Sequence, residues 1–249
     1  MFPRRIDLVL LILLLGGLTA QTPPADSIVA RIDRAERFDA VRSVMRQVIT
    51  TPGGDTRTLE METFSRDGND KQLLVYREPR RVAGDKILML NEGDDIWFYT
   101  PKTDRVRHLA SHARRQRVQG SDFAYEDMAG GRIAEDYRYQ LRGIVDLAGV
   151  PCFHLELTPT PSGPHYERLE LWADTTHYLS RRIDYFEDGQ LLKRLTCSDV
   201  RQVDGHWYPM TFTMANLQEG GRTVMETLEI AFDVEIPDAR FATNALKRR

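Results

Sequence analysis

Residues 114–127 read Arg-Arg-Gln-Arg-Val-Gln-Gly-Ser-Asp-Phe-Ala-Tyr-Glu-Asp, a stretch in which three arginines and three carboxylates surround two aromatic side chains. Gly120 permits a tight turn, and Ser121 or Asp122 can cap a short helix after it. A charged and aromatic plug of this kind, between strand-like segments, indicates a gate or latch rather than a catalytic site. A helix cap with surface ion pairs is the simpler alternative. The expected latch residues are Arg114, Arg115, Arg117, Ser121, Asp122, Tyr125, Glu126 and Asp127. We expect one of the three arginines to pair with one of the three carboxylates, and we expect Phe123 and Tyr125 to pack inward against the sheet.

On both sides of this stretch, apolar and polar residues alternate with the period of a β-strand. Turn signals such as Asp67-Gly68 and Asp188-Gly189 separate the alternating runs. Residues 25–40 instead have apolar residues at helical spacing, and a helical insertion is expected near 121–135. The predicted strands are 42–51, 58–64, 71–77, 85–91, 95–100, 104–109, 136–145, 150–158, 166–173, 178–187, 190–203, 207–216 and 222–233.

This pattern predicts a mainly β protein, of the α+β class, with a large antiparallel meander and one helix before it. A strongly curved sheet wrapped around the helix would bury the apolar faces of both. If the curve is too wide to be filled by side chains, an apolar cavity remains. Candidates for lining that cavity are Ile32, Met61, Leu73, Leu88, Leu90, Trp97, Tyr99 and Phe123. Period-two alternation also predicts that Trp97 or Tyr99 faces the interior and that Phe98 lies on the opposite face.

Residues 1–20 have the features of a signal peptide: Arg4 and Arg5 precede an apolar run of eleven residues, Leu8–Leu18, which is too short to span a bilayer. An uncleaved anchor is the alternative. We expect 21–249 to form a single periplasmic domain. The whole chain has 34 basic and 37 acidic residues, and loss of residues 1–20 would change its net charge from −3 to −4. This balance argues against nucleic-acid binding.

No convincing catalytic or metal-binding pattern is present. His108 and His112 lie four residues apart without an obvious carboxylate partner, and no G-x-S-x-G elbow or glycine-rich phosphate loop occurs. Cys152 and Cys197 are both expected in strands. An oxidising periplasm would allow them to pair, and two buried free thiols are the equal alternative. We therefore expect no cofactor and no metal.

Three motifs resemble a known family. Gly120-Ser-Asp-Phe-Ala-Tyr-Glu-Asp-Met128 is similar to a G-S-D-F-x-Y-E-D-[LM] signature. Asp95–Pro101, followed by Arg105 and Arg107, and His206–Pro209 are similar to two further elements. With these motifs, the chain resembles the outer-membrane lipoprotein-sorting family of the LolA/LolB-like superfamily, in its larger and less characterised branch.

The resemblance implies an unclosed half-barrel of about eleven antiparallel strands, covered by helices, that binds lipoprotein acyl chains in an apolar cavity. It also implies a periplasmic shuttle without a cofactor, and partners in a resistance-nodulation-division type exporter of the inner membrane and an outer-membrane acceptor. In the better-known carrier an arginine helps to hold the lid closed. Five residues compete for that role here: Arg105, Arg107, Arg114, Arg115 and Arg117.

We therefore expect a monomeric, non-catalytic carrier or chaperone for the acyl chains of a lipoprotein or another lipid. Two other classes are open: a periplasmic sensor or interaction domain that detects lipids or lipoproteins, and an accessory subunit of a lipid exporter. A hydrolase lacks a nucleophile and base arrangement in the sequence.

Overall fold

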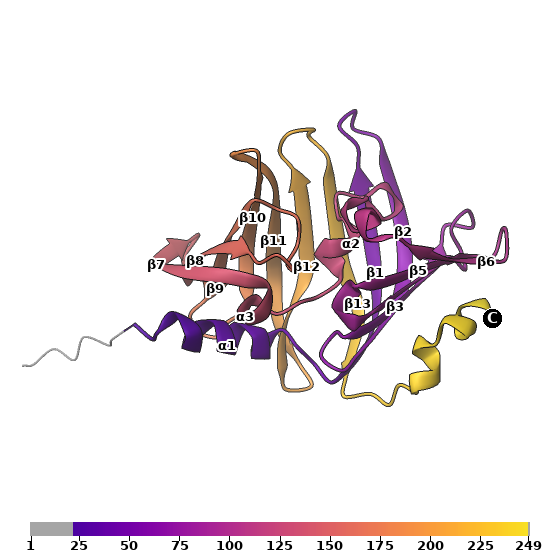
Figure 1. Ribbon diagram of the computed structural model, residues 1–249, viewed down its shortest axis with the longest axis horizontal. Helices are drawn as coiled ribbons and strands as arrows, with labels where there is room; N and C mark the ends of the chain where they lie inside the picture. The colour runs from indigo at the N-terminus through magenta and orange to yellow at the C-terminus, as the bar shows by residue number, and fades with distance from the viewer. Residues whose placement is uncertain (1–21, 249) are drawn as a thin grey trace, which may run out of the picture.

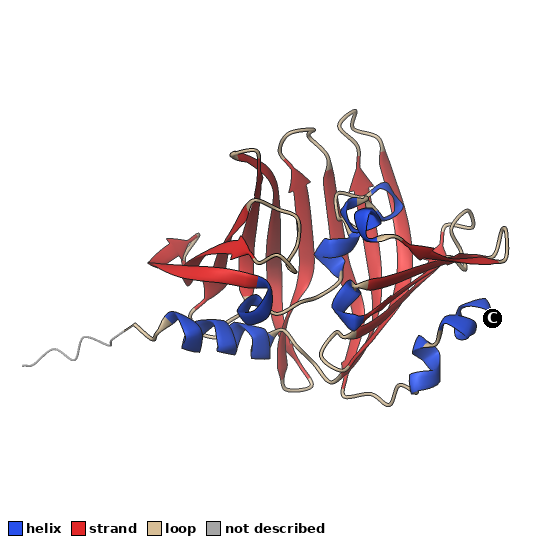
Figure 2. Ribbon diagram, in the orientation of Figure 1, coloured by secondary structure: helices blue, strands red, loops and turns tan. Residues whose placement is uncertain are grey.

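The computed structural model describes residues 22–248, and its framework is one unclosed antiparallel sheet of 13 strands (Figures 1 and 2). The strands are β1 Ala40–Thr50, β2 Thr56–Arg66, β3 Lys71–Glu78, β4 Lys86–Leu90, β5 Asp95–Thr100, β6 Arg105–Leu109, β7 Tyr137–Leu147, β8 Val150–Pro159, β9 Arg168–Asp174, β10 Ser180–Glu187, β11 Gln190–Val203, β12 His206–Asn216 and β13 Arg222–Phe232. The helices are α1 Ala25–Ala35, α2 Tyr125–Met128 and α3 Ile133–Asp136, with 3-10 turns at Asn91–Gly93, Ser111–Arg115, Val118–Gly120, Asp238–Phe241 and Thr243–Lys247. The predicted signal peptide, 1–20, lies outside the described residues.

The strand order explains the position of the latch segment. The order is β6-β5-β4-β3-β2-β1-β13-β12-β11-β10-β9-β8-β7, so the first and last strands pair at the centre and β6 and β7 form the two free edges. The chain between these edges, residues 110–136, must therefore cross from one side of the sheet to the other. It does so in front of the concave face, carrying α2 and α3 with it (Figure 1). We call residues 110–136 the crossover segment.

The main core lies on the concave face. Inward-facing residues of nearly every strand pack there with α1, whose Ile28, Val29 and Ile32 are fully buried. The helix ends at Ala35 and strand β1 begins at Ala40, so it is shorter than the predicted 25–40. Helices α1 and α3 contact each other and β7, which closes one end of the half-barrel.

A second, smaller core lies on the opposite, convex face of β2–β5. The C-terminal residues 233–248 pack against this face (Figure 1), and Phe241 and Leu246 are buried in it. Lys86 helps to fix this segment because its ammonium group donates to the carbonyl oxygen of Leu246 at 2.8 Å. The sheet is therefore apolar on both faces at this end.

For five of the residues predicted to line the cavity, the second core shows that the prediction is wrong. Leu73, Leu88, Leu90, Trp97 and Tyr99 all face it and not the concave side. Phe98 lies on the opposite face from Trp97 and Tyr99, as the alternation predicted, but it is Phe98 that packs against the main core. Alternation determines which residues share a face; it does not identify the concave face when both faces are covered.

Two further expectations are resolved by the sheet. All 13 strands predicted from the alternation pattern are present, whereas the count of about eleven implied by the resemblance is too low. Cys152 and Cys197 are both buried free thiols. In β8, the neighbouring residues Phe153 and Leu155 face the main core, so the Cys152 side chain points to the opposite face of the sheet. Cys197 lines the cavity, so the two thiols lie on different faces.

Within residues 22–248 no helix is long and apolar enough to cross a membrane.

Candidate functional site

A cavity of about 540 Å³ lies between the concave face of the sheet and the crossover segment. This volume falls within the range of about 300–1,000 Å³ that is typical of small-molecule sites. Its walls come from the end of α1, from β1–β3, from the turn before β5, from the crossover segment and from β7–β13. The site is therefore built from both halves of the chain and closed by the segment that joins them.

Most of the cavity wall is apolar because it consists of inward-facing strand residues. The strands contribute Met45, Leu74, Leu157, Leu169, Leu171, Ile183, Tyr185, Leu195, Phe212 and Met225. The crossover segment contributes Phe123, Met128 and Ile133. Of the cavity residues expected from the sequence, Phe123 is on this lining, whereas Ile32 and Met61 lie in the core behind it. An apolar cavity of this kind can be filled favourably by an apolar ligand.

The crossover segment is attached to the sheet at Asp122. Its backbone N–H donates to the hydroxyl of Thr223 in β13 at 2.9 Å, and that hydroxyl donates to the Asp122 carboxylate at 2.7 Å. Both residues are buried. Phe123 and Tyr125 are also buried and pack in the main core, as expected. This attachment leaves Asp122 unavailable as a helix cap. The N–H of Ala124 at the start of α2 instead donates to Asp127 at 2.6 Å.

A buried ion pair provides a second attachment. The Asp127 and Lys193 side chains are 1% and 7% exposed, and the Lys193 ammonium group donates to the Asp127 carboxylate. The hydroxyl of Tyr166 donates to the same carboxylate at 2.7 Å. The Lys193 nitrogen lies 4.9 and 5.1 Å from the ring centroids of Tyr166 and Tyr185. These donors compensate the charge of Asp127, and a buried carboxylate requires such compensation.

Lys193 was not identified from the sequence, although a signal was present. Lys193, Leu195 and Cys197 are two residues apart along β11, so their side chains share one face of the sheet. Because Leu195 and Cys197 line the cavity, the Lys193 side chain must also point inward. A lysine on a buried face requires an acidic partner. The sequence alone could not show that this partner is Asp127, which is 66 residues away.

The expected ion pairs within the latch are wrong. Arg114 pairs with Asp94 at 2.6 Å, and Arg117 pairs with Glu219 at the tip of the β12–β13 hairpin. Arg115 is exposed. The carboxylate of Glu126 contacts His165 at 3.0 Å. Residues 114–127 cross the sheet and have neighbours from other parts of the chain, so their charged groups pair with those neighbours and not with one another.

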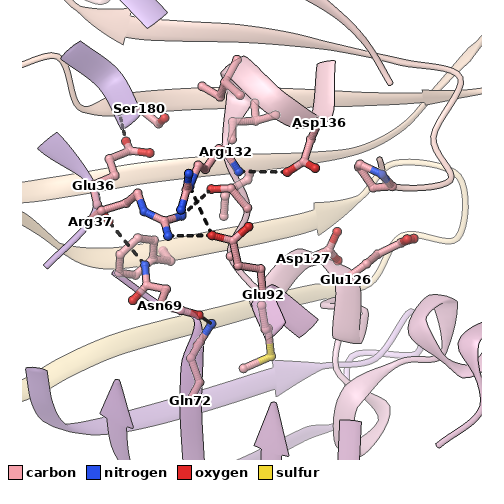
Figure 3. A pocket seen from close by; sticks show the side chains of 18 of the residues that line it. Glu36, Arg37, Asn69, Gln72, Glu92, Glu126, Asp127, Arg132, Asp136 and Ser180 are labelled. Atoms are coloured by element: carbon pink, nitrogen blue, oxygen red, sulfur yellow. Dashed lines mark hydrogen bonds and ion pairs between the residues drawn. The ribbon is translucent and has the colours of Figure 1, made fainter. Parts of the chain in front are cut away.

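The polar mouth of the cavity is shown in Figure 3. Arg37, just after α1, contacts Glu92 at 2.6 Å and donates to the carbonyl oxygen of Gly131 at 3.2 Å. Arg132 contacts the same Glu92 carboxylate at 3.3 Å. Arg37 thus links α1, the turn before β5 and the crossover segment. Neither Arg37 nor Arg132 was among the five arginines that the resemblance offered for this role. Arg105 and Arg107 are exposed residues of the edge strand β6.

Within residues 22–248, no group of three or more His, Cys, Asp or Glu side chains is arranged to hold a metal ion. Burial raises the pKa of the Cys152 thiol to about 11 and raises that of Cys197 further, which favours the neutral thiol in both. The apolar wall and the polar mouth together can enclose an apolar molecule.

Comparison with known proteins gives one matching family model and several solved structures of similar fold. A family model described as an uncharacterized protein family matches residues 68–248. No curated protein matches. A solved domain from Vibrio parahaemolyticus, provisionally assigned as an outer membrane lipoprotein-sorting protein domain, is 27% identical with a TM-score of 0.81, over 88% of this chain and 97% of that one. A DUF1329 family protein from Desulfovibrio piger is 28% identical with a TM-score of 0.83, over 88% and 96%.

A LolA superfamily protein from Nitrosomonas europaea shares the fold at 23% identity, with a TM-score of 0.75 over 90% of this chain and 100% of that one. These structures share the large unclosed sheet, and the family model covers more than half of the chain. The chain belongs to the uncharacterized family that the model describes, and it is similar in sequence and fold to solved proteins of the LolA-like lipoprotein-sorting group that its sequence motifs resemble.

Proposed function

We propose that this protein is a non-catalytic periplasmic carrier that encloses the acyl chains of a lipoprotein or lipid and shuttles them toward the outer membrane. The single observation that carries the proposal is the cavity of about 540 Å³, apolar over most of its wall and covered by the crossover segment. The similarity to a domain provisionally assigned as lipoprotein-sorting supports the same function. The proposal includes cleavage of residues 1–20 as a signal peptide and a monomeric domain over 21–249.

The energetic need for such a carrier follows from the cost of exposing acyl chains. Burial stabilises each CH₂ by about 0.8 kcal/mol, so a chain of about 16 carbons gains on the order of 10 kcal/mol in an apolar site. A carrier must also release this cargo. The crossover segment supplies a cover whose attachments, Asp122 to Thr223 and Asp127 to Lys193, are polar contacts that can be exchanged for contacts with a partner. An inner-membrane exporter and an outer-membrane acceptor are the partners we propose.

The test is binding of a neutral apolar dye, N-phenyl-naphthylamine, and its displacement by a neutral monoacylglycerol. We expect saturable binding to one site. Leu195→Gln places an amide on the cavity lining and should weaken dye binding several-fold. The matched control is Leu228→Gln, at a position that is 41% exposed, which should bind like the wild type. Absence of saturable binding, or equal binding by both variants, would rule out the cavity as a lipid site.

A further inference from the structure

Three carboxylates on the cavity lining form no ion pair with any lysine, arginine or histidine in the part of the chain that the structure describes. Asp33 accepts from the backbone N–H groups of Ile133 and Ala134 at 2.9 and 3.2 Å. Glu36 accepts from the N–H of Ser180 at 2.6 Å, and Asp136 accepts from that of Arg132 at 2.9 Å. Glu36 and Asp136 are shown in Figure 3. All three lie on or next to α1 and α3, and among residues 22–248 none of them forms an ion pair.

The arginines at the mouth form no ion pair with these carboxylates, although Arg114 attracts Asp136 and Arg132 attracts Asp33 at longer range. In the described part of the chain, the lining holds seven acidic residues and three arginines, and each arginine already pairs with Glu92 or Asp94. Burial raises the pKa of Glu36, and the nearby Asp33 raises it further. Burial likewise raises the pKa of Asp136. Like charges held close together on one cavity wall disfavour another anion and favour a cation.

An independent observation places hydrogen-bonding groups in the same cavity. Tyr185 is 5% exposed and lines the cavity, yet its hydroxyl has no hydrogen-bond partner within residues 22–248. Tyr137, the residue after Asp136, also lines the cavity with a hydroxyl that lacks such a partner. Burial raises the pKa of both phenols, so they are neutral at pH 7. A neutral phenol oxygen can accept a hydrogen bond from an N–H group of a ligand.

We propose that the cargo is cationic at its polar end: an ammonium group joined to a long apolar chain, and not a fatty acid or an anionic phospholipid. The carboxylates of Asp33, Glu36 and Asp136 compensate the charge, the phenols accept N–H groups, and the apolar wall holds the chain. This inference rests on the proposed carrier function and adds the chemical class of the ligand. The same ammonium chemistry is present in an amine lipid and in a lipopeptide with a free α-amino group.

The experiment compares three ligands that share a dodecyl chain: dodecylamine, dodecanamide and dodecanoate, each displacing N-phenyl-naphthylamine at pH 7. We expect dodecylamine to bind at least about tenfold more tightly than dodecanoate, with dodecanamide between them. Added salt should weaken the amine and leave the amide nearly unchanged, which tests the charge in the wild-type protein alone. A lipopeptide with a free α-amino group, compared with its N-acylated form, separates the two sources of the ammonium.

The variant that tests the carboxylates is Glu36→Gln combined with Asp136→Asn, because each amide oxygen can still accept the same backbone N–H. The amine-to-carboxylate ratio should fall to within about threefold. Glu229→Gln, at an exposed position, removes one charge outside the cavity lining and should leave the ratio unchanged. Failure of all three ligands to bind would overturn the carrier function itself. Equal binding of amine and carboxylate, or a ratio that the double variant preserves, would overturn only the cationic cargo.

Discussion

Removing the ammonium group of Lys193 isolates the contribution of the buried ion pair to stability. Lys193→Met keeps an unbranched chain of similar length, so packing against Tyr166 and Tyr185 is largely retained. Asp127, whose side chain is 1% exposed, then keeps its hydrogen bonds from Tyr166 and Ala124 but loses the ammonium group that neutralises it. Loss of one partner of a buried pair costs about 3–5 kcal/mol.

For a domain of this size, that loss should lower Tm by about 6–20 °C. The assay is thermal and urea unfolding of Lys193→Met beside the control Lys247→Met. Lys247 contacts Asp104 at 3.2 Å at the surface, and its loss should cost only about 0–1 kcal/mol. Adding Asp127→Asn to Lys193→Met should recover part of the stability, because no buried charge then remains. A loss below about 1 kcal/mol in Lys193→Met would refute the assignment of this pair as an attachment of the crossover segment.

Three further predictions concern single side chains. Phe123→Ala should lower the free energy of unfolding by about 3–5 kcal/mol in urea titration, because the ring is 4% exposed. Asp122→Ala should cost about 1–3 kcal/mol and Asp122→Asn less than about 1, since the amide oxygen can still accept from Thr223; equal losses would contradict this. Although burial raises it, the pKa of Asp184 is held below its usual range by Arg182 and Arg194. Its stabilisation is therefore complete above about pH 4, and Asp184→Asn should flatten the loss of stability as pH falls below that value.

Much of the fold could be predicted from local sequence. Alternation and turn signals located all 13 strands, because the apolar residues of a strand recur at every second position when one of its faces is buried. The order of the strands depends on pairings between distant segments, such as β1 with β13, which no local pattern contains. Alternation likewise predicts correctly that Trp97 and Tyr99 share a face. It cannot show that this face packs against the distant C-terminal segment and not against the cavity.

The site could be predicted less well than the fold. The motif around Phe123 marked the segment that covers the cavity, and both of its aromatic residues are buried as expected. The partners of its charges could not be found, because Thr223 and Lys193 lie more than 60 residues away in the sequence. Arg37 was missed for the same reason, since its ion-pair partner Glu92 is 55 residues away.

The crossover segment also limits how far the half-barrel can widen. It joins both free edges of the sheet, so any separation of β6 from β7 must lengthen the path that it spans. Helices α2 and α3 each contain four residues, too few to be stable without their packing contacts. Unwinding one of them from about 1.5 to 3.3 Å per residue would release about 7 Å of chain. Unwinding of these short helices would therefore lengthen the crossover segment, and the protein could accept a larger cargo while the segment stays attached at its other contacts.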